Sequence, residues 1–150
     1  SHNVIIVGAG NLGQALGNYA GFAEHGFNII AFFEVKDELC GKEIKGTPVL
    51  PMDEIDYFIN KYDVNIAILT VPQNEAQKVV DILSKTNIKG IWNFAPTKIN
   101  VPTGMVVENV HLIESLFTLS YQINEEKLQE RMLKRRKPPK CGKNLTNVIK

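Results

Sequence analysis

The sequence predicts an α/β fold with a doubly wound, mostly parallel sheet, and three observations support this prediction. Short apolar segments typical of strands alternate with helical segments along most of the chain. A glycine-rich turn follows the first apolar segment, and an acidic residue, Glu34, ends the second. Because crossovers between parallel strands are right-handed, helices are expected on both faces of one sheet.

The first predicted strand, at 4–7, leads directly into a glycine-rich turn and then a helix. In a dinucleotide-binding unit of the Rossmann type, Gly8 would permit the tight turn and Gly10 would let the backbone approach a pyrophosphate. Gly13 would let the helix pack closely against the strand. The free N–H groups at the start of this helix favour a phosphate.

A second strand is predicted at 28–33, and Glu34 follows it about 20 residues beyond the last glycine of the turn. At this offset a carboxylate accepts hydrogen bonds from the ribose hydroxyls and repels a 2′-phosphate. NAD(H) is therefore favoured over NADP(H), and the nearby Lys36 weakens this preference without reversing it. The simpler alternative is a carboxylate that is only solvated at the end of a strand.

The alternation of strands and helices continues after Glu34. The predicted segments are an extended piece at 46–51, a helix capped by Asp53 and ending near Tyr62, a strand at 64–71, a helix at 74–84, strands at 88–94 and 105–108, and two helices near 111–123 and 125–136. The segment 64–71 is nearly continuous in apolar residues, which is typical of a strand buried on both faces of a parallel sheet.

Ligands of such sheets bind at the carboxyl ends of the strands, so the residues that follow each strand are expected to share one crevice. The alternative for those near Pro72 and Pro96 is an ordinary turn that ends a strand. The predicted cofactor-binding residues are Gly8, Ala9, Gly10, Asn11, Leu12, Gly13, Glu34, Val35, Lys36, Thr70, Val71, Pro72, Asn93, Phe94, Ala95 and Pro96.

The composition is that of a chain with one ordinary core: 150 residues, 44% hydrophobic, with a net charge of +1. No apolar run is long enough to span a membrane, so a cytoplasmic location without membrane contact is expected. Cys40 and Cys141 have neither the spacing nor the histidine neighbours of a metal site. No metal site and no disulfide is predicted.

The charge is uneven, because residues 131–150 carry eight Lys and Arg residues and no acid. Such a tail could bind a polyanion, or it could simply be solvated and flexible. Ser1 and His2 resemble the remnant of an expression tag, and a longer natural chain is expected. The predicted boundaries are a tag remnant at 1–2, a dinucleotide-binding domain at 3–110, a helical dimerisation segment at 111–137 and a basic tail at 138–150.

Four segments taken together resemble one family, the redox-sensing transcriptional repressor Rex. They are Val7 to Leu16 with Tyr19, Ile68 to Pro72, Gly90 to Pro96 and Val107 to Val110, within a similarity that runs from about residue 3 to residue 123. The resemblance implies a noncatalytic domain that binds NADH or NAD⁺ in a homodimer. It also implies operator binding through a winged-helix domain that this sequence does not contain.

The same resemblance implies that C-terminal helices are exchanged between protomers, with Leu112, Leu116 and Leu119 on the exchanged stripe. By periodicity alone, such a stripe is more often intramolecular core. The family pairs the tyrosine at Tyr19 with an aspartate where this chain has His111, so the contact would here join a phenol to an imidazole.

Two alternatives remain open from the residues. A nicotinamide-dependent dehydrogenase fragment would need a proton donor or base near the nicotinamide, and no suitable cluster is evident. The CoA-binding domain of succinyl-CoA ligase α subunits shares the fold and the glycine turn. Glu34 is unfavourable to that reading, because it suits a free ribose diol better than the 3′-phosphate of CoA.

Overall fold

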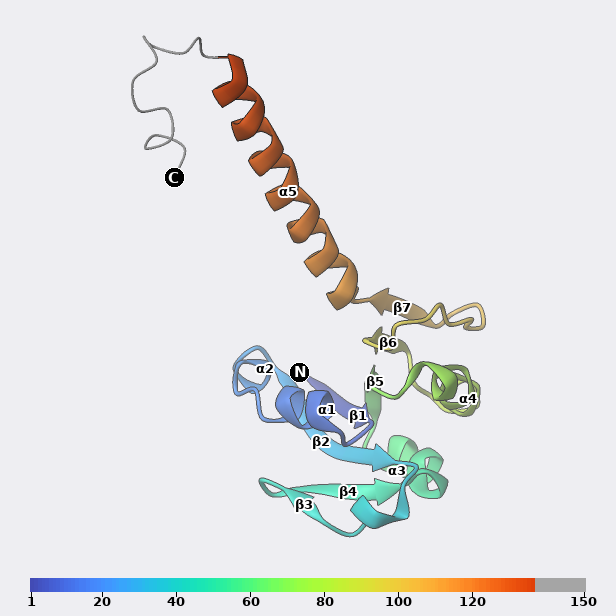
Figure 1. The fold of residues 1–150 in the computed structure, drawn as a ribbon. Helices are drawn as coiled ribbons and strands as arrows, with labels where there is room; N and C mark the ends of the chain where they lie inside the picture. The colour runs from blue at the N-terminus through green and yellow to red at the C-terminus, as the bar shows by residue number, and fades with distance from the viewer. Residues whose placement is uncertain (137–150) are drawn as a thin grey trace. The chain divides into compact units, whose positions relative to one another are not determined.

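The computed structural model describes residues 1–136, without the side chains of residues 37, 114 and 136. The expected basic tail at 138–150 lies outside the described residues. The chain divides into two compact units, residues 1–111 and the segment from Leu112 onward (Figure 1). The first unit holds the whole sheet.

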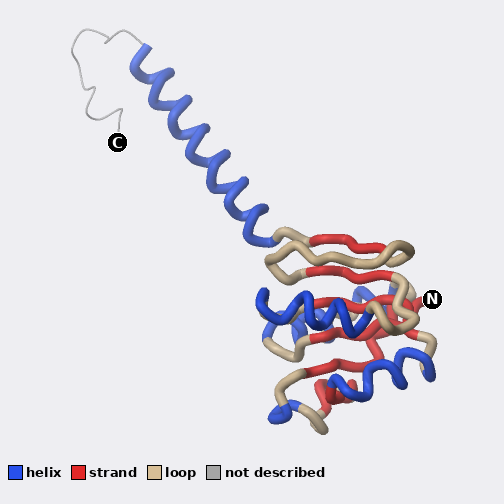
Figure 2. The backbone as a smooth tube through the Cα atoms, turned by 90° about the vertical axis from the view of Figure 1, so that its right-hand side faces the viewer, coloured by secondary structure: helices blue, strands red, loops and turns tan. Residues whose placement is uncertain are grey.

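The sheet has seven strands in the order β3-β4-β2-β1-β5-β6-β7. Neighbouring strands are parallel except for the antiparallel pair β3 and β4. Figure 2 shows the strands side by side in this sheet. The prediction of a doubly wound, mostly parallel sheet is confirmed. The strands are β1 (His2–Val7), β2 (Phe27–Glu34), β3 (Glu43–Ile44), β4 (Thr47–Pro51), β5 (Val64–Leu69), β6 (Gly90–Asn93) and β7 (Val106–Asn109).

Helices cover both faces of the sheet. In Figure 1, α1 (Asn11–Gly17) and α2 (Gly21–Glu24) lie on one face, and α3 (Ile55–Lys61) and α4 (Gln73–Leu83) lie on the other. This is the arrangement that right-handed crossovers produce when the strand order reverses beside β1. The reversal leaves a crevice at the carboxyl ends of β1 and β5, where such sheets bind ligands.

The core has two layers because β1 is buried on both faces. Val4 and Ile6 belong to the layer that includes Phe32, whereas Ile5 and Val7 belong to the layer beneath α3 and α4. Four apolar residues of α4 are buried in this second layer: Ala76, Val79, Val80 and Leu83.

Two local predictions were wrong, and one short strand was not predicted. Asp53 does not cap a helix, because it lies in a 3₁₀ turn, Met52–Glu54, and α3 begins at Ile55 without a side-chain cap. A short hairpin partner, β3, precedes the extended piece, and its turn uses positive φ angles at Lys45 (48°) and Gly46 (85°), as two-residue hairpin turns require. The two C-terminal helices are one continuous helix, α5 (Leu112–Arg136).

The second unit begins with the helix α5. This helix has 25 residues, and its apolar side chains are exposed. Among residues 1–136, no helix is both long and apolar enough to cross a membrane. The exposed apolar residues are Leu112, Ile113, Leu116, Phe117, Leu119, Tyr121, Ile123, Leu128, Met132 and Leu133.

Candidate functional site

A pocket of about 440 Å³ lies at the carboxyl ends of β1, β2, β5 and β6. We call it the strand-end pocket. It brings together most of the residues that the sequence assigned to a cofactor site, and it adds Glu75. Its lining residues are Gly8, Gly10, Leu12, Glu34, Val35, Lys36, Thr70, Val71, Pro72, Glu75, Phe94 and Pro96.

The glycine turn forms one wall of the strand-end pocket, and its glycines differ in how much space a side chain would have. Gly8 has a φ of 110°, and a Cβ there would lie 2.6 Å from the Thr70 hydroxyl oxygen. No heavy atom lies within 4 Å of the place where a Cβ of Gly10 would be. Gly10 is therefore the point in the turn that leaves space for a ligand to approach the backbone.

The close approach of α1 to the sheet occurs at two glycines. A Cβ on Gly13 would overlap the carbonyl oxygen of Gly8, which explains the glycine at that position. A Cβ on Gly17 would overlap the ring of Phe32 on β2. Gly17 thus has the packing role toward the sheet that the sequence assigned to Gly13, while Gly13 packs against the turn itself.

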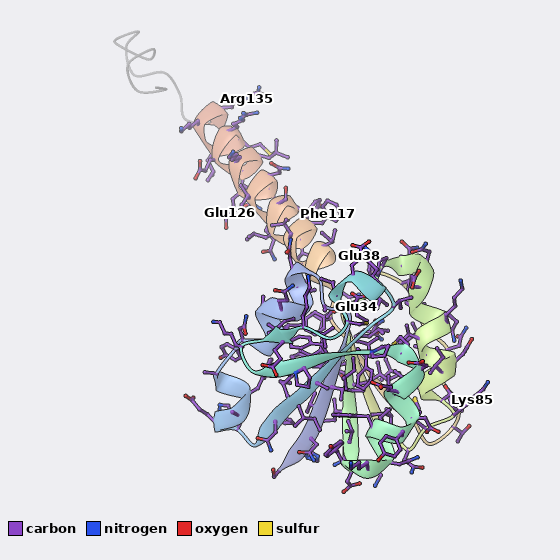
Figure 3. The ribbon with its side chains drawn as sticks, turned by 90° about the horizontal axis from the view of Figure 1, so that it is seen from below. Glu34, Glu38, Lys85, Phe117, Glu126 and Arg135 are labelled. Atoms are coloured by element: carbon purple, nitrogen blue, oxygen red, sulfur yellow. The ribbon has the colours of Figure 1, made fainter. Side chains whose placement is uncertain are left out.

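Glu34 is fixed at the pocket by two backbone amides. The N–H of Ala9 donates to Oε1 at 3.1 Å, and the N–H of Lys36 donates to Oε2 at 2.9 Å. Each carboxylate oxygen accepts more than one hydrogen bond, so both remain able to accept from a ligand. Figure 3 labels Glu34 and the neighbouring Glu38. The hydrogen bonds to the turn argue against a carboxylate that is merely solvated.

Thr70 joins the ends of two strands beneath the pocket. Its backbone N–H donates to the carbonyl of Val7 at 2.9 Å. Its hydroxyl lies 3.1 Å from that carbonyl oxygen and 3.0 Å from the carbonyl oxygen of Gly8, to either of which it can donate. Thr70 therefore holds the glycine turn against the end of β5.

Glu75 is the lining residue that the sequence reasoning missed. It lies in the first turn of α4, and its backbone N–H donates to the carbonyl of Pro72 at 2.9 Å. Acidic residues are favoured in the first turn of a helix by the helix dipole. The signal in the sequence is therefore its position three residues after a proline that ends a strand.

Five predicted residues do not line the pocket. Asn11 is exposed as the first residue of α1. The other four are buried behind the lining, where they shape the turn and the loop after β6: Ala9, Gly13, Asn93 and Ala95.

None of the residues predicted for a switch or dimer contact is among the lining residues of the strand-end pocket. Tyr19 is 61% exposed, and its ring packs edge-on against Phe22 with the centroids 4.9 Å apart. Leu112, Leu116 and Leu119 are exposed on α5. The contact between Tyr19 and His111 stays a prediction.

A second hollow of about 360 Å³ is lined by residues of the sheet together with Phe22 of α2, and we call it the apolar groove. Apart from Gly90 and Glu108, its lining is entirely hydrophobic. The groove is lined by Val4, Phe22, Phe27, Ile29, Ile66, Ile68, Gly90, Ile91, Trp92, Val106 and Glu108.

Neither hollow has the character of a metal centre. Within residues 1–136, no group of three or more His, Cys, Asp and Glu side chains could hold a metal ion.

Comparison with protein families gives a match to the CoA binding domain over residues 1–97. A Redox-sensing transcriptional repressor Rex from Clostridioides difficile (strain 630) is 49% identical over 126 residues, which are 84% of this chain and 60% of that protein. One from Caldanaerobacter subterraneus subsp. tengcongensis is 44% identical over 132 residues, which are 88% of this chain and 59% of that protein. The chain thus spans about 60% of the length of these relatives.

Solved structures of RSP, a Rex-family repressor, are similar in fold and sequence. The complex of RSP with β-NADH has a TM-score of 0.82 and 42% identity over 88% of this chain and 64% of that one. The complex with β-NAD⁺ and operator DNA has a TM-score of 0.81 and 41% identity over 91% of this chain and 63% of that one. The resemblance to Rex repressors is therefore confirmed, and the chain belongs to the CoA-binding domain family.

Proposed function

We propose that this chain is the NAD(H)-binding sensory domain of a Rex-like repressor that responds to the ratio of NADH to NAD⁺. The observation that carries the proposal is the strand-end pocket, whose lining includes both Gly10, where the side-chain position is open, and Glu34, which accepts a hydrogen bond from the glycine turn. The similarity of this chain to RSP, which has been solved with β-NADH and with β-NAD⁺, supports the same assignment.

The lining residues match the parts of a dinucleotide. The N–H groups at the start of α1 would bind the pyrophosphate beside Gly10. Glu34 would accept hydrogen bonds from the adenosine ribose hydroxyls, with Val35 and Lys36 beside the adenosine. The residues after β5 and β6 would then border the nicotinamide half.

CoA is the main competing ligand, because the matching family is described as a CoA binding domain. The position of Glu34 is unfavourable to CoA, since a carboxylate at the ribose repels the 3′-phosphate. The family description fits a fold that binds an adenosine-containing nucleotide. The residues that contact the ribose then determine whether that nucleotide is NAD(H) or CoA.

We infer that the pocket senses the cofactor and does not turn it over. The relatives are named as transcriptional repressors. In the strand-end pocket, Glu34 is engaged by the glycine turn, and no histidine or cysteine is among the described lining residues. Hydride transfer would need a proton donor or base beside the nicotinamide.

We further infer a homodimer in which the apolar groove is covered by α5 of a second copy. The groove lining is almost entirely hydrophobic, and the apolar side chains of α5 are exposed. Apolar hollows of this kind are typical of interaction sites. The family resemblance implies the same exchange of C-terminal helices. Operator DNA would be bound through a part of the relatives that this chain does not span, and the domain would act in the cytoplasm.

Regulation requires that NADH and NAD⁺ bind the states of the dimer with different affinity. A ligand of equal affinity for both states shifts no equilibrium. The preferred state would then determine whether the complete repressor binds its operator.

Calorimetric titration of the purified chain with NADH, NAD⁺, NADPH and CoA tests this function. We expect the tightest binding for NADH, weaker binding for NAD⁺ and little for CoA. Tight CoA binding with no NADH binding would replace the proposed function with that of a CoA-binding domain.

A further inference from the structure

Asn93, the last residue of β6, is the buried polar residue among those described, with 1% of its surface exposed. Its side-chain amide donates to the carbonyl of Thr97 at 3.2 Å and to Oδ1 of Asn109 at 3.0 Å. Its Oδ1 accepts from the N–H of Ala95 at 3.0 Å. One side chain therefore connects the loop after β6 to the last residue of β7.

The main chain of Asn93 makes a further link to the same place. The N–H of Val110 donates to the carbonyl oxygen of Asn93 at 2.9 Å. Asn93 and Asn109 are also register partners in the parallel pair of β6 and β7. The segment that these bonds hold, Asn109 and Val110, comes two residues before α5 begins at Leu112.

The loop after β6 reaches the strand-end pocket through Phe94 and Pro96, which both line it. Farther along, the loop is held against α4 by Gln77, which accepts from the N–H of Asn100 at 2.9 Å and donates to its carbonyl at 3.0 Å. The pocket-lining part is thus anchored on one side by Asn93 and on the other by α4.

The bonding pattern explains why position 93 holds asparagine. Two acceptors and one donor face it, and an amide satisfies all three at once. An aspartate would place a carboxylate against the two oxygens that now receive hydrogen bonds. An apolar side chain would leave the Ala95 N–H and the Thr97 carbonyl without this partner, which is unfavourable in a buried place.

From this geometry we propose that Asn93 is a positioning residue that couples the pocket-lining loop after β6 to the start of α5. It holds Phe94 and Pro96 at the pocket and ties them, through Asn109 and Val110, to the segment from which α5 departs. Nucleotide occupancy that steadies the loop therefore also steadies this segment. The inference rests on the proposed function, because NADH is the ligand whose occupancy is transmitted.

The test compares amide hydrogen exchange at Val110, whose N–H donates to the Asn93 carbonyl, with and without saturating NADH. In Asn109→Ala the Asn93 amide loses one acceptor on an exposed residue, so the fold is kept. Asn109→Asp retains an acceptor oxygen. Asn60→Ala is the matched control, because it removes the acceptor of another exposed pair, the 2.6 Å bond from Asn87, at a distant place in the chain.

We expect NADH to slow exchange at Val110 in the unaltered chain by about threefold or more, which is the size of the net contribution of one hydrogen bond. Asn109→Ala should remove most of this slowing while changing NADH affinity by less than about threefold. Asn109→Asp and Asn60→Ala should both keep the slowing of exchange by NADH. A purely structural role would lower the melting temperature without altering the response to NADH.

Three results would overturn the proposal. If the unaltered chain binds NADH without any change at Val110, the coupling is refuted and the proposed function stands. The same holds if Asn109→Ala responds to NADH as the unaltered chain does. If the unaltered chain does not bind NADH at all, the proposed function fails and the coupling fails with it.

Discussion

The strand-end pocket and the apolar groove belong to the same sheet but are built in opposite ways. In the pocket, polar groups are fixed by backbone hydrogen bonds, as Glu34 is by Ala9 and Lys36. The groove is a stretch of sheet face lined by hydrocarbon, with Phe22 and Trp92 in edge-on contact. Fixed polar groups favour a specific polar ligand, whereas a bare apolar face favours another protein surface.

The largest effect expected is on the pocket, from Gly10→Val. Gly10 has a φ of −76°, which any residue adopts, and its side-chain position is open, so the fold is kept while the approach of a pyrophosphate is blocked. NADH affinity should fall about 100-fold, close to 2.7 kcal/mol, in a calorimetric titration. The control is Gly90→Val in the groove, which should bind NADH normally. If Gly10→Val binds NADH with unchanged affinity, the pyrophosphate does not bind at this turn.

The next largest effect is on the groove, from Val106→Asp. Val106 lies on the edge strand β7 and is 70% exposed, so the free chain tolerates the change. Covering an unpaired carboxylate with an apolar helix costs about 2 kcal/mol or more, which weakens dimerisation at least about 30-fold. Sedimentation velocity measures this shift. The control is Tyr57→Asp on α3, at the opposite face of the sheet, which should leave the dimer intact. If Val106→Asp also leaves the dimer intact, the apolar groove is not the dimer interface.

A smaller effect, specific for one cofactor, is expected from Glu34→Ala. Losing a charged acceptor of the ribose hydroxyls should weaken NADH binding about tenfold. NADPH should lose less, because the same change removes repulsion of its 2′-phosphate. Glu38→Ala, an exposed acid nearby, is the control for charge alone. Equal losses for NADH and NADPH would place Glu34 away from the ribose.

The smallest effect is expected from Glu75→Gln. This change removes one negative charge from the pocket lining while the side chain keeps its size. NADH affinity should rise about twofold at low salt and less at high salt, because the repulsion is screened. A loss of affinity, measured in the same titrations, would instead make the Glu75 carboxylate a ligand of the cofactor.

The pocket could be predicted from sequence because its signals are local and strong. Glycines and prolines mark where each apolar strand ends, and parallel strands all end at one edge of the sheet. The sequence therefore predicts that Gly10, Glu34, Thr70 and Phe94 share one pocket. The structure places all four along its lining.

Other features depend on contacts that no local pattern reveals. Gly17 is small because the Phe32 ring lies against it, and that neighbour is fixed only by the tertiary fold. The hairpin turn at Lys45 and Gly46 has a weaker signal than the Asn-Gly pair typical of such turns. The helix α5 was divided in two although no glycine or proline interrupts residues 112–136. The apolar groove arises from an uncovered face, which periodicity within single strands does not show.

An NMR titration of the ¹⁵N-labelled chain with NADH tests the central claim most directly, because it separates the two regions residue by residue. We expect the largest amide shifts at Gly10, Leu12, Lys36 and Thr70 in the strand-end pocket, with smaller ones at Ile29 and Ile66 in the apolar groove. Shifts concentrated in the groove, or no shifts at all, would contradict this claim.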